Sequence, residues 1–282
     1  MRVLAKLENA RWLDRIGDAV RRAVLATVGK GRVGETLHGQ PIGHPAHPAI
    51  VQFPVGAWMS AAMLDLLPGT EHAATALLVA GTAGTLPAVV TGAADFGTLS
   101  REQRRVALVH AAANTAAVGL FTASIVARLR GDHRRGRALS FAGVGVAGAG
   151  AYLGGHLAFA QAAGVNHAAA ALPRVPLEWS AVDSVDSFTD GKVGTRAFGD
   201  TTVLVYRENG RFSVMVAECA HRGGPLADGR TIDVDGQTCV QCPWHGSVFA
   251  LADGHAVHGP AGSDQVLLRT RVRDGLLEAA RP

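Results

Sequence analysis

Four long apolar stretches dominate the first part of the chain, at residues 48–67, 72–95, 105–128 and 138–162. A helix of about 20 apolar residues is long enough to cross the roughly 30 Å hydrocarbon core of a bilayer. The alternative is a soluble, Ala-rich helical bundle, but soluble helices of this length carry a clear polar face. The pattern therefore predicts an all-α four-helix transmembrane bundle over residues 46–165.

Small residues crowd these stretches, most of all the fourth, where Gly150 and Gly154 form a GxxxG motif. Small side chains let helix backbones approach closely within lipid, so we expect a tight bundle. Pro54 and Pro87 fall inside the first two stretches and predict kinks there, because proline removes a helical hydrogen bond and clashes with the preceding turn.

The segment before the bundle, residues 1–45, has an amphipathic pattern. Basic residues surround a set of apolar residues that recur at helical spacing, namely Leu4, Leu7, Ala10, Trp12, Ile16, Val20 and Val24. This pattern suits a helix lying at the membrane surface. A solvated helix docked on the bundle is the alternative. We expect no secretory signal peptide, because no apolar core precedes a cleavage site.

The pattern changes after a short linker, residues 166–176, which contains Pro173 and Pro176. From residue 177 to residue 282 the sequence predicts an all-β domain. Near its end, QVLLRTRV and LLEAA flank an Asp-Gly turn, which is typical of two closing strands.

The candidate chemistry lies in two short strings of this domain. Cys219-Ala220-His221 and Cys242-Pro243-Trp244-His245 each supply one thiol and one imidazole. Such a set suits a Rieske [2Fe–2S] centre, in which two thiolates hold one iron and two imidazoles hold the other. It also matches a zinc site in composition, although zinc fingers usually pair Cys with Cys and His with His. A degenerate domain without metal is the third alternative.

The two strings extend to CAHRGGPLADG and CPWHGSVFALADG, and GPA follows at residues 259–261. Through these strings, this part of the chain resembles the Rieske ferredoxin family. The resemblance covers roughly residues 177–282. It implies that Cys219 and Cys242 hold the buried iron. It also implies that His221 and His245 hold the outer iron and present their edges to a redox protein partner at the tip of the domain.

Comparison with the family also predicts what differs here. Rieske proteins of cytochrome bc complexes carry a disulfide between the ligand loops, and its positions match Gly224 and Trp244, so we expect the ferredoxin type. Ser247 stands where the family uses a serine to hydrogen-bond the cluster, but Phe249 stands at the tyrosine position. We therefore expect a potential in the lower or middle part of the Rieske range, about −150 to +300 mV. The third cysteine, Cys239, is predicted to be a buried structural thiol on a strand.

The 37 residues after His245 leave no room for the large iron-containing domain of a Rieske oxygenase, so we expect an electron relay. Further strings in the apolar region resemble an uncharacterised bacterial family of four-helix membrane domains, found alone or fused to Rieske domains. They are LHGQPIGHPAHP (37–48), FPVGAW (53–58), GAADF (92–96), VHAAANT (109–115) and YLGGHLAFAQAAGVNH (152–167). The resemblance implies a multi-pass protein of the bacterial cell membrane.

A second candidate site gathers at one end of the predicted bundle, where His47, Asp95, His110 and His156 fall toward the same membrane face. Ionisable groups inside a membrane are costly and usually functional. Three interpretations remain open. They are a b-type haem with two axial histidines, a quinone or proton-transfer pocket, and a hydrogen-bond network that holds the bundle together.

The distribution of charge bears on the orientation of the protein in the membrane and on its partners. The net charge is +4 and the isoelectric point is near 9.3, which suits anionic lipid headgroups, and no motif points to nucleic acid. Basic residues are nearly balanced between the two sides. One side has the five arginines of the third loop, namely Arg128, Arg130, Arg134, Arg135 and Arg137. The basic N-terminal tail and the lack of a cysteine pair for a disulfide place the Rieske domain in the cytoplasm.

The sequence thus predicts a membrane-anchored Rieske protein that relays single electrons between a redox partner and an acceptor. The first alternative is a quinone- or haem-linked membrane oxidoreductase that uses the Rieske domain as its relay. The second is a redox sensor.

Overall fold

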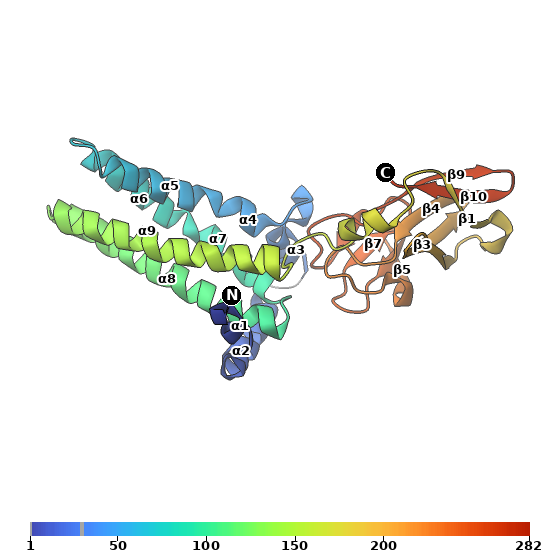
Figure 1. Cartoon of the computed structure of the whole chain (residues 1–282), viewed down its shortest axis with the longest axis horizontal. Coiled ribbons are helices and arrows are strands. Elements are labelled where there is room, and N and C mark those ends of the chain that lie inside the picture. The colour runs from blue at the N-terminus through green and yellow to red at the C-terminus, as the bar shows by residue number, and fades with distance from the viewer. Residues whose placement is uncertain (1, 29–30) are drawn as a thin grey trace. The chain divides into compact units, whose positions relative to one another are not determined.

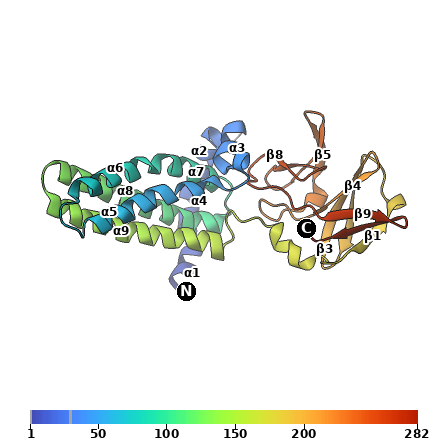
Figure 2. The ribbon, with the colours of Figure 1, turned by 90° about the horizontal axis from the view of Figure 1, so that it is seen from above.

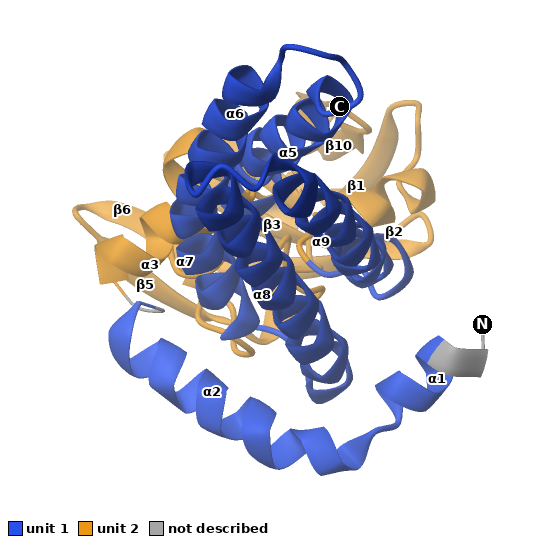
Figure 3. Ribbon diagram, turned by 90° about the vertical axis from the view of Figure 1, so that its left-hand side faces the viewer, with its two compact units in different colours: residues 1–29, 46–163 blue, residues 30–45, 164–282 orange. Residues whose placement is uncertain are grey.

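The computed structural model describes residues 2–28 and 31–282, which form two compact units (Figures 1 and 3). The helical unit contains residues 1–29 and 46–163, and the β unit contains residues 30–45 and 164–282. The segment 1–45, treated as one piece in the sequence, is thus divided between the units. Its residues 1, 29 and 30 lie outside the described residues.

Four helical segments of the helical unit pack around one another. Helix α5 contacts α6 and α9, and α8 contacts the same two helices, so the four close into a ring (Figures 1 and 2). The helices of the unit are α1 (Arg2–Glu8), α2 (Asp14–Thr27), α4 (Ala46–Ile50), α5 (Gln52–Leu64), α6 (Glu71–Ala83), α7 (Thr85–Phe96), α8 (Arg101–Leu129) and α9 (His133–Gly155). A π-helical turn, His156–Ala160, follows α9 directly.

The first two predicted helices are interrupted. Helix α4 gives way to α5 at Val51, and α6 gives way to α7 at Gly84. Each interruption lies three residues before a proline, Pro54 or Pro87. The proline ring clashes with the carbonyl four residues earlier, so the expected kinks are confirmed as helix boundaries.

The prediction of four membrane-length helices is met in part. Within the described residues, three stretches are long and apolar enough to cross a membrane, Glu71–Phe96, Arg101–Leu129 and His133–Ala160. The predicted stretch 48–67 is not among them, and its main helix, α5, has 13 residues. At 1.5 Å per residue, such a helix is about 20 Å long.

The surface of the helical unit is apolar. Only 22%, 22% and 17% of the apolar windows in the three long stretches are buried inside the unit. Large side chains such as Leu86, Leu129 and Phe159 point outward, the last with 92% of its surface exposed. Inside, Trp58 of α5 stacks on Phe121 of α8 with ring centroids 4.2 Å apart. This distribution fits a membrane-associated protein.

A buried ion pair joins α8 to the end of α5. The two guanidinium nitrogens of Arg128 donate to the two carboxylate oxygens of Asp65 over 2.8 and 2.5 Å, and both side chains are 1% exposed. Arg128 also donates to Ser124 Oγ over 3.2 Å. Arg128 therefore lies within the bundle and not among the loop arginines with which the sequence grouped it.

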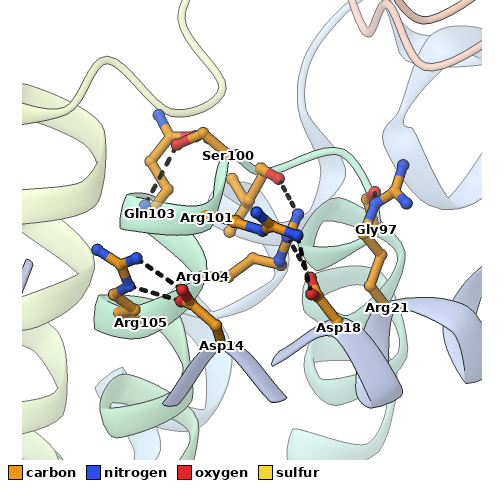
Figure 4. A network of polar contacts seen from close by, with 10 residues as sticks. Asp14, Asp18, Arg21, Gly97, Ser100, Arg101, Gln103, Arg104 and Arg105 are labelled. Carbon is orange, nitrogen blue, oxygen red and sulfur yellow. Dashed lines mark hydrogen bonds and ion pairs between the residues drawn. The ribbon is translucent and has the colours of Figure 1, made fainter. Parts of the chain in front are cut away.

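Ion pairs also fix α2 against the bundle (Figure 4). Asp14 accepts two hydrogen bonds from Arg105 over 2.6 and 2.8 Å, and Asp18 accepts one from Arg104 over 2.7 Å. The hydrogen bond from Arg105 holds the pKa of Asp14 below its ordinary value. Ser100 and Gln103 form a capping box that starts α8 beside this network.

The opposite side of α2 keeps apolar side chains on the surface. Trp12, just before the helix, is 74% exposed, and Ile16 and Val20 are 50% and 37% exposed. Leu13 and Val24 are buried. The helix therefore has one face docked on the bundle, as one of the two alternatives predicted, and a second apolar face that is uncovered.

The β unit consists of three small antiparallel sheets, with strand orders β1-β10-β9, β2-β3-β4 and β5-β6-β7-β8. The strands are β1 (Ser180–Ser184), β2 (Val193–Phe198), β3 (Thr201–Glu208), β4 (Arg211–Val216), β5 (Arg230–Val234), β6 (Gln237–Gln241), β7 (Val248–Ala250), β8 (Ala256–His258), β9 (Arg269–Arg273) and β10 (Leu276–Ala280). The two predicted closing strands are confirmed as β9 and β10, joined by Asp274-Gly275.

Two segments from outside the predicted domain complete the β unit. Ala168, Ala171 and Val175 of the predicted linker are buried in its cores. Helix α3 (Gly31–His38) and the 3₁₀ turn Gln40–Ile42 belong to the same unit, and the Gln40 side chain donates to the carbonyl of Ala256. Neither segment acts as a free linker.

Candidate metal centre

The first ligand loop follows β4 and is closed by backbone hydrogen bonds. The amide of Cys219 donates to the carbonyl of Gly224 over 2.8 Å, and the amide of Gly223 donates back to the carbonyl of Cys219 over 2.7 Å. Gly223 has φ +67°, a left-handed conformation that glycine adopts without a Cβ clash. The loop therefore returns on itself within six residues and projects the side chains of Cys219 and His221.

The second ligand loop joins β6 to β7 and repeats the same design. The amide of Cys242 donates to the carbonyl of Ser247 over 2.8 Å, and the amide of Gly246 donates to the carbonyl of Cys242 over 3.1 Å. Gly246 has φ +76° at the position equivalent to Gly223. Two loops of matching geometry thus present one thiol and one imidazole each.

The four side chains meet as two like pairs. Cys219 and Cys242 are buried and linked by a thiol–thiol hydrogen bond. The rings of His221 and His245 lie edge to face with centroids 5.1 Å apart. His221 is half-buried, whereas His245 and its neighbour Trp244 are exposed. The structure therefore pairs the four sequence-predicted side chains, thiol with thiol and imidazole with imidazole.

Protonation in this pocket favours metal ligation. The hydrogen bond from Cys219 lowers the pKa of Cys242 to about 6, while the same bond and burial raise the pKa of Cys219. One thiolate is therefore present near neutral pH. Burial, followed by the nearby His245, lowers the pKa of His221 to about 2, so this imidazole is neutral. Thiolate and neutral imidazole are the ligand forms that metals require.

Further observations test whether an iron–sulfur cluster fits. The hydroxyl of Ser247 is buried and has no hydrogen-bond partner among the described residues. This is expected for a side chain that donates to a bound cluster. A Cβ placed on Gly224 would lie 2.9 Å from the Cys242 sulfur and 3.1 Å from the Trp244 ring. Glycine is thus required between the loops, and the two positions matched to the bc-type disulfide lie side by side.

All three cysteines are free, and Cys239 is buried in β6 as predicted.

Gln265 holds the first loop from behind, a role that sequence reasoning missed. Its amide oxygen accepts the backbone N–H of Ala220 over 2.8 Å, and its amide nitrogen donates to the carbonyls of Val216 and Glu218 over 2.6 and 2.8 Å. The side chain is buried. A lone glutamine after GPA carries no signal for this role in a single sequence.

A second missed feature is the segment that contains α3. His38 at the end of α3 is buried, and after burial and His245 it is one of the nearby groups that lower the pKa of His221. Glu35 accepts hydrogen bonds from His258 Nδ1 over 2.9 Å and from the amide of Gly259 over 3.4 Å. The segment 31–45 therefore packs beside the metal centre, near His221 through His38 and near the end of the second loop through Gly259, while His245 remains exposed.

The residues predicted for a second site, in the helical unit, do not all come together. His47 of α4 and His110 of α8 meet with ring centroids 6.4 Å apart. His156, in the π-helical turn, donates from Nε2 to Glu8 Oε1 over 2.8 Å instead. Asp95 lies half-buried in α7, and its carbonyl accepts a hydrogen bond from the Thr98 hydroxyl.

Two family models match this chain. One, for the Rieske [2Fe-2S] domain, matches residues 178–270. The β unit carries a Rieske domain. The other, described as a predicted membrane protein family (DUF2231), matches residues 43–167. Both resemblances expected from the sequence are confirmed. The Rieske domain implies a [2Fe–2S] cluster, and the two pairs of ligands fit it.

Curated relatives match parts of this chain. A human Rieske domain-containing protein is 36% identical over 64 residues, covering 23% of this chain and 41% of the relative. The oxygenase component of chloroacetanilide N-alkylformylase from Rhizorhabdus wittichii is 35% identical, covering 31% of this chain and 24% of the relative. This chain therefore spans less than half of either relative.

A shorter relative is matched over most of its length. The anthranilate 1,2-dioxygenase ferredoxin subunit of Burkholderia cepacia is 26% identical, covering 36% of this chain and 90% of the relative. Among solved structures, a chain from the oxygenase–ferredoxin complex of carbazole 1,9a-dioxygenase aligns with 23% identity and a TM-score of 0.32. That alignment covers 36% of this chain and 92% of the other.

Proposed function

We propose that this protein is a membrane-anchored electron carrier that relays single electrons between a redox partner and an acceptor. The observation that carries the proposal is the pairing of two buried thiols and two imidazoles on matching loops, with one imidazole exposed. A bound [2Fe–2S] cluster supplies reversible one-electron chemistry. The protein supplies the ligands and a covered pocket.

In this proposal each side chain has its own role. Cys219 and Cys242 hold one iron, and His221 and His245 hold the other. The unpartnered hydroxyl of Ser247 donates a hydrogen bond to the cluster. Because Phe249 is buried in the core where high-potential relatives use a tyrosine, only one such hydroxyl is present. We therefore expect a potential in the lower or middle part of the Rieske range.

The exposed face around His245 and Trp244 is proposed as the docking surface for the redox protein partner. Trp244 is 59% exposed, and large aromatic side chains at protein surfaces favour protein contacts. The side of the centre that includes His221 is lined by the chain's own segment 31–45. Electrons would then pass to or from a partner at the His245 side.

The helical unit is proposed as the membrane anchor. Its exposed apolar surface, its three membrane-length helices and the family match support this role. We further propose that α5 completes a four-helix bundle in the bilayer and that the uncovered face of α2, with Trp12 and Ile16, rests at the interface. The basic N-terminal region favours the cytoplasmic side for the β unit and a bacterial cell membrane as its location.

A reduced-minus-oxidised spectrum and an electron paramagnetic resonance spectrum of the full chain in mild detergent test the carrier proposal. We expect the rhombic signal of a reduced Rieske cluster, loss of that signal in His245→Ala, and no turnover with quinol alone. A protein that contains zinc in place of iron would refute the proposal. Steady quinol oxidation would instead favour the oxidoreductase alternative, and redox-dependent capture of a partner without electron transfer would favour the sensor.

A further inference from the structure

The two histidines that meet in the helical unit come from helices far apart in the sequence. His47 lies in α4 and His110 in α8, and their ring planes are 83° apart. Both are half-buried. Placing two imidazoles inside an apolar helical bundle is costly, so their meeting requires a physical reason.

Each imidazole is fixed by a helix carbonyl. His47 Nδ1 lies 2.9 Å from the carbonyl oxygen of Ala88, and His110 Nδ1 lies 2.7 Å from that of Gly150. A carbonyl oxygen only accepts, so Nδ1 carries the proton in both rings and Nε2 keeps its lone pair. Metal-bound histidines are oriented in this way, with the second nitrogen donating to a backbone or carboxylate oxygen.

Neighbouring helices carry glycine at the positions where they pass the imidazole rings of His47 and His110. A Cβ on Gly92 of α7 would lie 2.8 Å from His47 Cε1, and one on Gly154 of α9 would lie 3.1 Å from His110 Cε1. Any other residue at Gly92 would collide with the imidazole. The bundle is therefore shaped around both rings, and not around one.

The spacing of the rings matches two ligands on one metal. A metal–nitrogen bond of about 2.0 Å, with about 1.2 Å from nitrogen to ring centre, puts the centroids about 6.4 Å apart across a linear N–metal–N unit. The observed separation is 6.4 Å. Perpendicular planes are compatible with ligands on opposite faces of a flat macrocycle.

The number of ligands identifies the class of cofactor. Among the described residues of the helical unit, no group of three or more His, Cys, Asp or Glu side chains is arranged to hold a metal ion, so this pair has no third protein ligand. A bare zinc ion would need further protein ligands, whereas a haem brings four nitrogens of its own and needs only two axial imidazoles. We propose that His47 and His110 are the axial ligands of a b-type haem in the helical unit.

Asn114 separates this proposal from a purely structural network. Its amide nitrogen lies 3.2 Å from His110 Nε2 and 3.3 Å from His110 Nδ1, and it donates to the carbonyl of His110 over 3.0 Å. Iron at Nε2 would displace the first of these contacts and leave the bond to the carbonyl, so Asn114 is dispensable for the haem. In a structural network Asn114 would be a full member. Ferric haem accepts one electron to become ferrous haem, which balances one electron from a reduced cluster.

The test uses the full chain, purified in mild detergent from cells supplied with a haem precursor, and then titrated with hemin. We expect about one haem per chain, with sharp Soret and α bands on reduction by dithionite. His47→Ala and His110→Ala should each lower the haem content at least tenfold and leave the Rieske resonance signal unchanged. His156→Ala, His44→Ala and Asn114→Ala should retain the bands.

His110→Ala could lose haem because the protein misfolds, so His110→Met serves as a second variant. Methionine can still ligate the iron and raises its potential. We expect haem to be retained with a shifted potential. Wild-type protein that contains no haem and takes up no hemin would overturn the proposal, as would bands that survive His47→Ala. Quinol oxidation lost in His110→Ala without any haem would assign the pair to a quinone. The cluster signal, measured separately, reports on the proposed carrier function.

Discussion

Each unit of this protein brings two histidines together, and the two pairs differ in how they are held. His221 and His245 stand on loops whose turns depend on glycine, and His245 is exposed. His47 and His110 stand on helices, and each ring is fixed by a carbonyl of another helix. Loops let a ligand pair reach the surface of a domain, whereas helices bury a pair inside a bundle. The first arrangement suits exchange with a partner, and the second suits an internal cofactor.

The largest expected effect is loss of the cluster when a thiol ligand is removed. In Cys242→Ser we expect no Rieske resonance signal, because one iron loses a ligand, while the helical unit keeps its helix content. The matched control is Cys239→Ala, which removes a buried thiol from the neighbouring strand β6. Retention of the full signal in Cys242→Ser, or its loss in Cys239→Ala, would contradict the ligand assignment.

A large effect on stability is expected in the helical unit from the buried pair of Asp65 and Arg128. Arg128→Met leaves an uncompensated buried carboxylate, which typically costs about 3–5 kcal/mol. Thermal unfolding in detergent, followed by circular dichroism, measures the loss. The double variant Asp65→Leu, Arg128→Met should recover most of it. Glu71→Gln is the control, because Glu71 lies 3.9 Å from Arg137 in an exposed pair and should change stability by less than about 1 kcal/mol.

Gln265 tests how firmly the first ligand loop is held. Gln265→Leu leaves the amide of Ala220 and two carbonyls without this partner, at about 1–3 kcal/mol for each unsatisfied buried group. We expect the cluster to form but to be lost faster to a chelator, measured by bleaching of its visible absorbance. Gln237→Leu, at the start of β6, should behave as wild type. An unchanged rate of loss in Gln265→Leu would show that the loop is fixed by other contacts.

The ligand residues were predictable from sequence because Cys and His at fixed spacing report their chemistry directly. The contacts of Gln265, Glu35 and His38 were not, since each joins segments far apart in the chain and depends on the fold. The same holds in the helical unit. Helical periodicity indicated four apolar stretches, but it could not show that His110 meets His47 while His156 meets Glu8.

A smaller effect is expected on the potential. Ser247→Ala removes the hydroxyl proposed to hydrogen-bond the cluster. If that bond stabilises the reduced form by about 0.5–1.5 kcal/mol, the potential should fall by roughly 20–60 mV for a one-electron couple. A spectroscopically monitored redox titration measures the change. Ser213→Ala, whose hydroxyl bonds the carbonyl of Ala252, is the control and should leave the potential unchanged. If the potential is equal in Ser247→Ala and wild type, the Ser247 hydroxyl does not hydrogen-bond the cluster.

The smallest effect concerns the segment beside His221. Glu35 is 15% exposed and its partner His258 is 47% exposed, so the pair should contribute no more than about 1 kcal/mol. Loss of that energy in Glu35→Ala permits more frequent opening of residues 31–45, by at most about five-fold. Hydrogen–deuterium exchange of this segment measures the change, with Glu178→Ala in the exposed loop before β1 as the control. If exchange rises while the amides of the second ligand loop stay protected, the segment is a separable cover on the His221 side. A Cβ on Gly262 would lie 2.7 Å from the carbonyl oxygen of His38, so the backbone at Gly262 packs closely against the segment. If exchange does not change, this packing and the hydrogen bond from Gln40 hold the segment without Glu35, and the difference in exposure between the two cluster histidines is built into the fold of the β unit.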